Sequence, residues 1–236
     1  MFKAVVSDLD GTLLNAEHKV SEFTRETVEL LLKKGIKFYI ATGRNYLGAK
    51  EAMDELGVKV PLITSHGSVA FDENGNEIFS NNLKREYLDK VLDIDYKSFG
   101  KDIIITGYSG PNWFVTEDLR EYFYNKKPDR TRYPKQITPE EFKKHNFTKI
   151  FFLGEDHDEL LELENEIRKA VGDGNISLLF ANEGSLEVFS ANCNKAKAAE
   201  VLLERDGLTL KDSVSFGDGL NDYELITETG LGYLVL

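Results

Sequence analysis

Two aspartates near the start of the chain have the spacing of a catalytic or metal-binding pair. Asp8 and Asp10 follow the short apolar run 4–6. Because alternate residues of an extended chain face the same side, both carboxylates are expected to point at one place. Two neighbouring negative charges favour a cation, and ligation by oxygen alone favours Mg²⁺. An ordinary turn is the alternative interpretation, since aspartate and glycine are common in turns.

A hydroxyl, a glycine and a cation come directly after a second apolar run. Thr42, Gly43 and Arg44 follow residues 36–41, so they offer a hydrogen-bonding side chain, a backbone that a ligand can approach and a positive charge. Thr42 could equally cap a helix. His66 holds the equivalent position after a third run, where it could also be an exposed loop residue.

An acidic loop and a lysine late in the chain complete the set. The loop 217–222 follows another apolar run and contains Asp218, Asn221 and Asp222, without the ligand spacing of an EF-hand. Lys195 opens a helical segment. Alone, these are an ordinary Gly/Asp-rich loop and a solvated charge. In an open parallel sheet, however, ligands bind at the carboxyl ends of the strands, so one crevice could gather all four segments for phosphoryl transfer.

The order of apolar runs predicts the elements that hold these segments. Strands alternate with helical segments through about residue 64, and parallel strands need such crossovers, so we predict an α/β fold with a doubly wound, Rossmann-like parallel sheet. The turn 108–112 instead indicates an antiparallel hairpin and a second kind of sheet. We predict a core domain made of residues 1–82 and 187–236, and an inserted α+β domain at 83–186.

The composition and net charge of the chain are typical of a globular protein and disfavour several other classes. The chain has 236 residues, of which 41% are hydrophobic and 30% charged, which fits one large or two modest globular domains. A net charge of −12 disfavours binding to nucleic acid and to anionic membranes. No apolar run approaches the ~20 residues of a membrane span, residues 1–8 do not resemble a signal peptide, and Cys193 is the single cysteine. We therefore expect a soluble cytoplasmic protein.

These segments and their order resemble the haloacid dehalogenase superfamily. The resemblance rests on 8–14, 41–44, Lys195 and 217–222, and the place and length of the insert resemble the large α+β cap of the Cof-type phosphatases. It implies a hydrolase in which Asp8 attacks phosphorus and becomes a transient aspartyl phosphate. Asp10 would protonate the leaving oxygen and then act as base for the hydrolytic water. An aspartate at this second position is typical of the phosphatases, so dehalogenation is not expected.

The resemblance also implies how metal and substrate are held. Asp8, the main-chain carbonyl of Asp10 and Asp218 would hold Mg²⁺, and Asp222 would act from behind them, orienting Lys195. Four residues would bind the phosphate of the substrate: Thr42, Gly43, Lys195 and Asn221.

Two departures from the family pattern carry expectations of their own. Many Cof-type relatives have Asn-Gly where this chain has His66 and Gly67, so we expect His66 to tune specificity. Relatives usually continue with a helix after the last strand, whereas this chain stops at Leu236. Since an uncovered apolar edge strand invites pairing, we expect either a shortened protein or a homodimer through the C-terminal edge.

The function predicted from these features is a magnesium-dependent phosphatase for small phosphomonoesters such as sugar phosphates or phosphorylated cofactors. The cap would select the leaving group, with Tyr108, Trp113, Asn182 and Glu183 as candidate contacts. A phosphomutase, a receiver-like phosphoacceptor and an inactive ligand-binding protein are the alternatives. A receiver domain carries no insert of about a hundred residues, a length typical of a whole domain.

Overall fold

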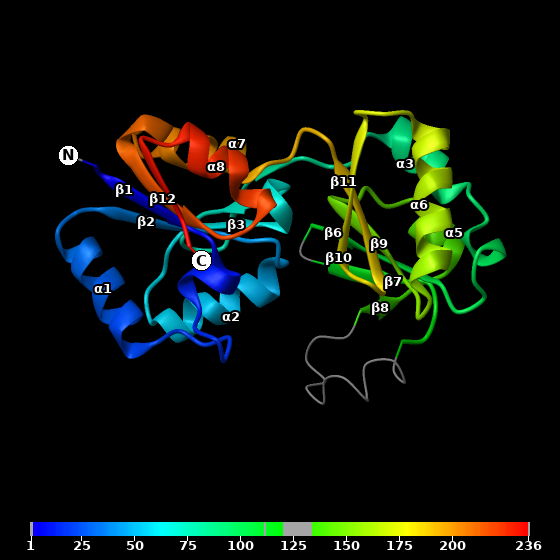
Figure 1. Cartoon of the computed structure of the whole chain (residues 1–236), viewed down its shortest axis with the longest axis horizontal. Helices are drawn as coiled ribbons and strands as arrows, with labels where there is room; N and C mark the ends of the chain where they lie inside the picture. Colours follow the sequence, from blue (N-terminus) through cyan, green and yellow to red (C-terminus); the bar gives the residue numbers. More distant parts are fainter. Residues whose placement is uncertain (1, 111, 120–133, 236) are drawn as a thin grey trace. The chain divides into compact units, whose positions relative to one another are not determined.

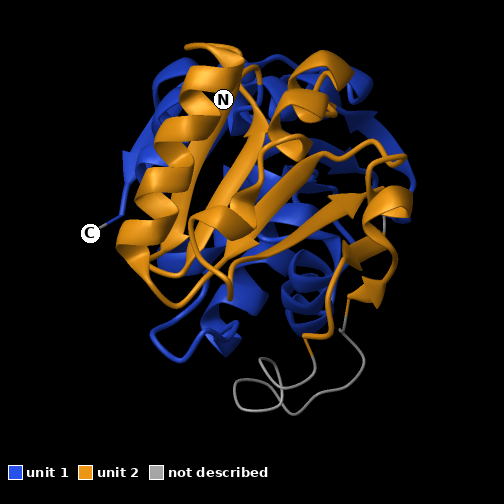
Figure 2. Cartoon of the chain, turned by 90° about the vertical axis from the view of Figure 1, so that its right-hand side faces the viewer, with its two compact units in different colours: residues 1–80, 193–236 blue, residues 81–192 orange. Residues whose placement is uncertain are grey.

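The structure, a computed structural model, describes residues 2–110, 112–119 and 134–235 (Figure 1). It divides into two compact units, drawn in different colours in Figure 2. Unit 1 consists of Met1–Ser80 and Cys193–Leu236, and unit 2 of Asn81–Asn192. The predicted boundary at 186/187 falls inside strand β11 (Ser185–Ser190), which pairs with two strands of unit 2. The second boundary therefore lies at 192/193 instead.

Unit 1 is built on a seven-stranded sheet in the order β13-β12-β1-β2-β3-β4-β5. Five neighbouring strands are parallel, which confirms the predicted α/β fold with a Rossmann-like core. They are β1 (Ala4–Ser7), β2 (Lys37–Ala41), β3 (Leu62–Thr64), β12 (Ser213–Gly217) and β13 (Leu231–Leu234). The sheet continues in an antiparallel extension that was not predicted, made of β4 (Val69–Phe71) and β5 (Glu77–Ser80).

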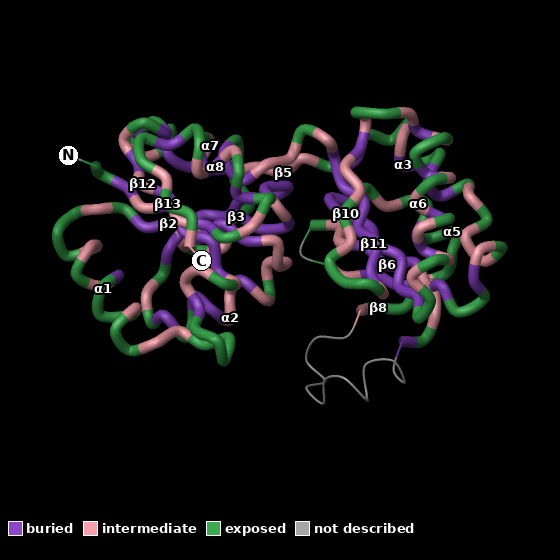
Figure 3. Tube along the Cα trace, viewed as in Figure 1, coloured by how far each residue is buried: buried purple, intermediate pink, exposed green. Residues whose placement is uncertain are grey.

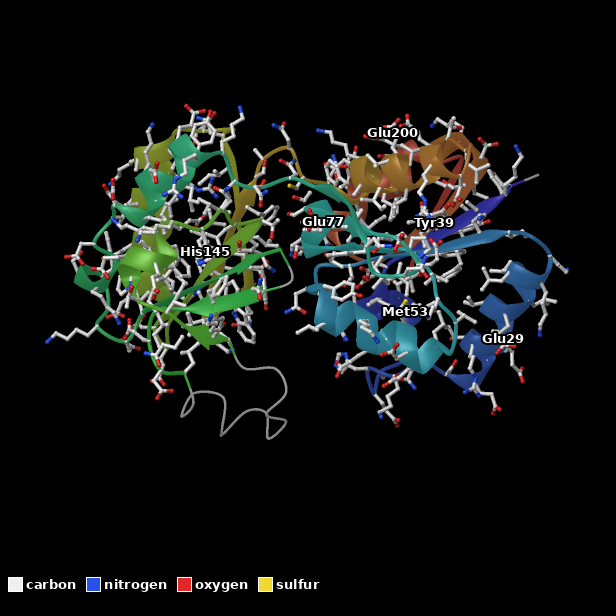
Figure 4. The ribbon with its side chains drawn as sticks, turned by 180° about the vertical axis from the view of Figure 1, so that it is seen from behind. Glu29, Tyr39, Met53, Glu77, His145 and Glu200 are labelled. Carbon is white, nitrogen blue, oxygen red and sulfur yellow. The ribbon has the colours of Figure 1, made fainter. Side chains whose placement is uncertain are left out.

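Helices cover both faces of this sheet because its central strands are apolar on both sides. Phe38 and Ile40 of β2 pack with the helices α1 (Glu22–Lys33) and α2 (Tyr46–Leu56), whereas Tyr39 and Ala41 pack with α7 (Lys195–Arg205) and α8 (Tyr223–Glu228). Figure 4 labels Tyr39 and, from the opposite cluster, Met53 of α2. Such two-sided burial is what a parallel sheet with crossover helices requires.

The starts of these helices are fixed by capping side chains. Ser21 accepts a hydrogen bond from the amide of Thr24 at the start of α1. Asn45 and Asn194 cap α2 and α7 in the same way. The cap of α2 is therefore Asn45, which excludes the interpretation of Thr42 as its cap.

Unit 2 contains a six-stranded sheet in the order β10-β11-β9-β6-β7-β8, with helices α3 (Arg85–Leu92), α5 (Pro139–Phe142) and α6 (His157–Val171). The remaining strands are β6 (Ile104–Ser109), β7 (Asn112–Val115), β8 (Lys135–Gln136), β9 (Lys149–Leu153) and β10 (Ile176–Asn182). β6 and β7 are antiparallel, with Tyr108 opposite Trp113, as the hairpin prediction required; Pro111 of the predicted turn lies outside the described residues. The apolar core of unit 2 joins alternate residues of these strands to α3 and α6.

Strand β13 lies at one edge of the sheet of unit 1. It is the least buried of the parallel strands (Figure 3). The side chain of Leu234 is 60% exposed. The predicted strand extended to Leu236, which lies outside the described residues. Pairing of two copies through this edge stays a prediction. Within the described ranges, no helix combines the length and the apolar character that a membrane crossing needs.

Candidate active site

The carboxyl end of β1 places Asp8 beside the acidic loop that follows β12. The amide of Asp8 donates to the carbonyl oxygen of Phe216, 3.0 Å away, so the two strands are still joined at this point. The chain then turns sharply, with Gly11 at φ +79°. A Cβ on Gly11 would lie 2.3 Å from Oδ2 of Asp218. Glycine is therefore needed here both for the turn and for the close approach of the two loops.

Lys195 is fully buried between two carboxylates. Its Nζ lies 2.5 Å from Oδ1 of Asp8 and 2.6 Å from Oδ1 of Asp222, whose side chains are only 6% and 1% exposed. The interpretation of Lys195 as a solvated charge is thus wrong. A buried ammonium needs such partners, because an unpaired charge in this position would be strongly destabilising.

Asp222 holds the acidic loop and the lysine together. Its Oδ2 accepts hydrogen bonds from the amides of Asp218 and Gly219, at 3.2 and 3.1 Å, while Oδ1 contacts Lys195. Thr12 donates to Oδ1 of Asp218 across 3.2 Å. The expected contact between Asp222 and Lys195 is therefore present, and the same side chain shapes the loop that carries Asp218.

Three carboxylates form a group that fits a divalent cation. Asp8, Asp218 and Asp222 each offer an oxygen, and these oxygens lie within 4.8 Å of one another. Lys195 contacts two of these carboxylates, Asp8 and Asp222, and burial raises the pKa of Asp8 to about 6 even though Lys195 opposes the shift. A bound cation would stabilise the ionised carboxylates, and their oxygens are ligands that Mg²⁺ accepts.

The carboxylate of Asp10 does not join this group; it forms an ion pair with Arg44. Nε of Arg44 donates to Oδ2 across 2.8 Å and Nη2 to Oδ1 across 2.5 Å, and Nδ1 of His18 lies 3.6 Å from Oδ1. The expectation that both aspartates point at one place is wrong, because β1 ends at Ser7 and Asp10 lies in the turn Leu9–Leu13.

The partners of Asp10 also set its protonation. Burial raises its pKa, but the hydrogen bonds and charge of Arg44, with a contribution from His18, lower it more, so the pKa of Asp10 lies below its ordinary value. Asp10 is therefore ionised while Arg44 holds it. Arg44 was predicted only as a cation near the site, and neither residue type nor spacing pointed to His18.

The segment after β2 is tied to the loop after β3. The amide of Thr42 donates to the carbonyl oxygen of Ile63, and its hydroxyl accepts from the amide of Arg44 across 3.1 Å. His66 lies directly over Gly43, since a Cβ there would be 2.5 Å from Cε1 of the ring. Asn221, from the acidic loop, approaches the same ring, with Nδ2 3.3 Å from Nδ1. The residues predicted to bind phosphate are thus linked in part through His66.

The candidate specificity residues of unit 2 make local contacts. Nε1 of Trp113 donates to the hydroxyl of Thr106 across 2.6 Å, and the rings of Trp113 and Tyr108 lie 5.6 Å apart. Asn182 accepts from the amide of Gly184 within the β10–β11 turn, and the carbonyl oxygen of Glu183 lies 2.9 Å from Nδ1 of His157. For Trp113, Tyr108 and Asn182 these contacts involve the side chain, whereas Glu183 takes part through its main-chain carbonyl.

The sequence matches the haloacid dehalogenase-like hydrolases over residues 5–236. The chain belongs to this family. The resemblance read from the four motifs is therefore confirmed. In this hydrolase three of the motifs lie at the carboxyl ends of β1, β2 and β12, and the fourth, Lys195, begins α7.

Known proteins similar to this hydrolase agree with that assignment. An HMP-PP phosphatase of Enterobacter sp. (strain 638) is 30% identical over 236 residues, covering 100% of this chain and 84% of the relative. A solved structure from Thermotoga maritima has a TM-score of 0.83 at 23% identity, covering 98% of this chain and 85% of that one. A solved subclass IIB sugar phosphatase has a TM-score of 0.76 at 22% identity, covering 98% and 86%. The two solved structures confirm the fold.

Proposed function

We propose that this hydrolase is a magnesium-dependent phosphatase that cleaves small phosphomonoesters through an aspartyl phosphate on Asp8. The observation that carries the proposal is the buried contact of Lys195 with both Asp8 and Asp222, beside the exposed carboxylate of Asp218. Lys195 holds one carboxylate oxygen of Asp8. The same carboxylate lies next to the acidic loop that carries Asp218, where a cation would fit. The phosphatase names of the relatives support the same reaction.

Each residue would have a separate task. Asp8, Asp218 and the main-chain carbonyl of Asp10 would hold Mg²⁺, with Asp222 close enough to contribute an oxygen. When bound, the ion supplies positive charge against the phosphoryl oxygens. Lys195, Thr42, Gly43 and Asn221 would bind those oxygens, and Lys195 would also keep Asp8 oriented for attack.

Two aspartates would carry out the two chemical steps, one as nucleophile and one as acid and base. In the first, a carboxylate oxygen of Asp8 attacks phosphorus, the bond from phosphorus to the ester oxygen breaks, and Asp10 gives its proton to that oxygen. In the second, Asp10 takes a proton from water, the water oxygen attacks phosphorus, and the bond to Asp8 breaks to release inorganic phosphate. Because Arg44 favours the ionised form of Asp10, the acid role requires this pair to loosen when substrate binds.

Replacing Asp10 by asparagine is expected to separate the two steps. Asparagine can neither donate the proton nor accept one from water, so steady-state turnover should fall by about 10²- to 10⁴-fold. An aryl phosphate, whose leaving group needs little protonation, should still give a burst of about one phenol per enzyme, because the first step survives. Rapid mixing measures the burst. Steady-state turnover equal to that of the wild type would contradict the assignment.

Removal of divalent cations is the direct test of the proposed metal dependence. Hydrolysis of an aryl phosphate by the wild type should fall by about 10²-fold or more in EDTA and return with excess Mg²⁺. Binding should also raise Tm of the wild type, since a ligand of the folded state stabilises it. The matched variant Asp218→Asn should lose most of that shift. Full activity in EDTA would refute the metal dependence.

We further propose that the substrates are small phosphorylated metabolites, with unit 2 as the cap that the family resemblance implies. The relatives named HMP-PP phosphatase and sugar phosphatase support this substrate class. A panel of sugar phosphates, phosphorylated cofactors and a phosphopeptide, each assayed for phosphate release with Mg²⁺, tests it. Preference for the phosphopeptide would overturn the proposed class.

A further inference from the structure

The loop after β3 has an unusual backbone that presents one side chain. Three consecutive residues have positive φ angles: Ser65 at 50°, His66 at 59° and Gly67 at 91°. Positive φ is uncommon for residues other than glycine, and such conformations persist only where the surroundings impose them. Ser65 and His66 both have this conformation, so contacts with the rest of the unit must hold the loop in place.

Contacts from two sides impose this conformation. The amide of Ser65 donates to the carbonyl oxygen of Arg44 across 2.8 Å, and that of His66 to the carbonyl oxygen of Thr42 across 3.1 Å. On the other side, a Cβ on Gly67 would lie 2.2 Å from the carbonyl oxygen of Asn194, just before α7. The loop is thus fixed between the segment 42–44 and the start of the helix that carries Lys195.

The conformation directs the half-buried ring of His66 onto two of the residues proposed to bind phosphate. The ring lies against Gly43, where an added methyl group would come within 2.5 Å of Cε1 and 3.0 Å of both ring nitrogens. Its Nδ1 lies 3.3 Å from Nδ2 of Asn221. Whether the amide donates to the ring or is turned to accept from it, the hydrogen bond fixes the plane of the Asn221 amide.

We propose that His66 is a positioning residue for the substrate, because its ring fills the space left by Gly43 and fixes the Asn221 amide toward the phosphate. The proposal rests on the phosphatase function above. Asn221 is exposed and lies in the short helical turn Leu220–Asp222, so without the ring its side chain would have to be ordered when the ligand binds. Loss of that ordering weakens phosphate binding while the groups of the chemical step stay in place.

Two substitutions at His66 distinguish the ring from the backbone. His66→Gly relieves the positive φ but removes the ring, so it should fold and yet raise the KM for an aryl phosphate and the Kd for inorganic phosphate about tenfold, with kcat within about twofold. His66→Asn tolerates positive φ and restores a polar group near the position of Nδ1, so it should bring both constants back to within about threefold of the wild type.

A second pair of variants tests the contact with Gly43. Gly43 does not have a positive φ, so alanine suits its backbone and conflicts mainly with the ring. Gly43→Ala should weaken phosphate binding about tenfold in the wild type but by less than about threefold in His66→Gly, because the displaced ring is already absent. Equal losses in both backgrounds would overturn the proposal, as would wild-type phosphate affinity in His66→Gly.

Binding of inorganic phosphate in the presence of Mg²⁺, measured by calorimetry, separates this proposal from the proposed function. A wild-type protein that binds phosphate but hydrolyses no ester refutes the phosphatase, and the variants still decide the role of His66. A wild-type protein that does not bind phosphate overturns both. Thermal melting of each variant confirms that the folded protein is being compared.

Discussion

Asp8→Asn is expected to abolish phosphate release from an aryl phosphate, with kcat lower by about 10⁴-fold or more. The neutral amide cannot attack phosphorus, and no aspartyl phosphate can form. Because asparagine has nearly the same shape and Lys195 keeps its contact with Asp222, the fold should survive. Phosphate release and circular dichroism measured on the same preparation check both parts of the expectation.

The matched control for this variant is Asp54→Asn, an exposed aspartate of α2 paired with Lys50. It removes one negative charge from the same unit and should keep activity within about twofold, since exposed ion pairs contribute little. Turnover by Asp8→Asn at the level of this control would end the assignment of Asp8 as nucleophile.

Lys195→Met is expected to have the largest effect on stability. It removes the ammonium that pairs with two buried carboxylates while keeping a side chain of similar length, so the free energy of unfolding in EDTA should fall by about 3–5 kcal/mol. Urea denaturation measures the loss. Lys197→Met, two residues along α7 at an exposed position, is the control and should change stability by less than about 0.5 kcal/mol.

This loss should depend on pH in a defined direction. The pKa of Asp8 is about 6 in the folded protein against an ordinary value of 3.8, so the folded state takes up its proton first as pH falls. Protonation of Asp8 therefore increases the free energy of unfolding as the pH falls below about 7. A protonated carboxyl needs no counter-charge, so the deficit of Lys195→Met relative to the wild type should shrink between about pH 8 and pH 5. Equal stability of Lys195→Met and Lys197→Met at the upper end of this range would refute the burial argument.

The site was predictable where residue type and position at a strand end agree. Asp8, Asp218 and Asp222 come together because β1 and β12 are adjacent parallel strands, and the alternation of strands and helices predicts such a sheet. The burial of Lys195 was predictable only through the family resemblance, because a lysine at a helix start is ordinarily solvated.

The errors arose where local pattern does not determine tertiary contacts. The spacing predicted that Asp10 lies beside Asp8. However, β1 ends at Ser7, and the carboxylate of Asp10 forms an ion pair with Arg44. The turn at Gly184 predicted that two strands pair, yet it did not say which sheet they join, so the domain boundary was set within β11 rather than after it. The residue types of Ser65 and His66 do not predict the backbone conformation that these two residues adopt.

The position of β1 between β2 and β12 has a consequence for synthesis on the ribosome. The strand that pairs with one side of β1 begins at Ser213, more than two hundred residues later. Translation of the intervening residues 8–212 takes about 10–40 s at the usual 5–20 residues per second. During that interval one side of β1 is an open template for pairing. We therefore expect nascent chains arrested before residue 213 to recruit chaperones more strongly than the released protein.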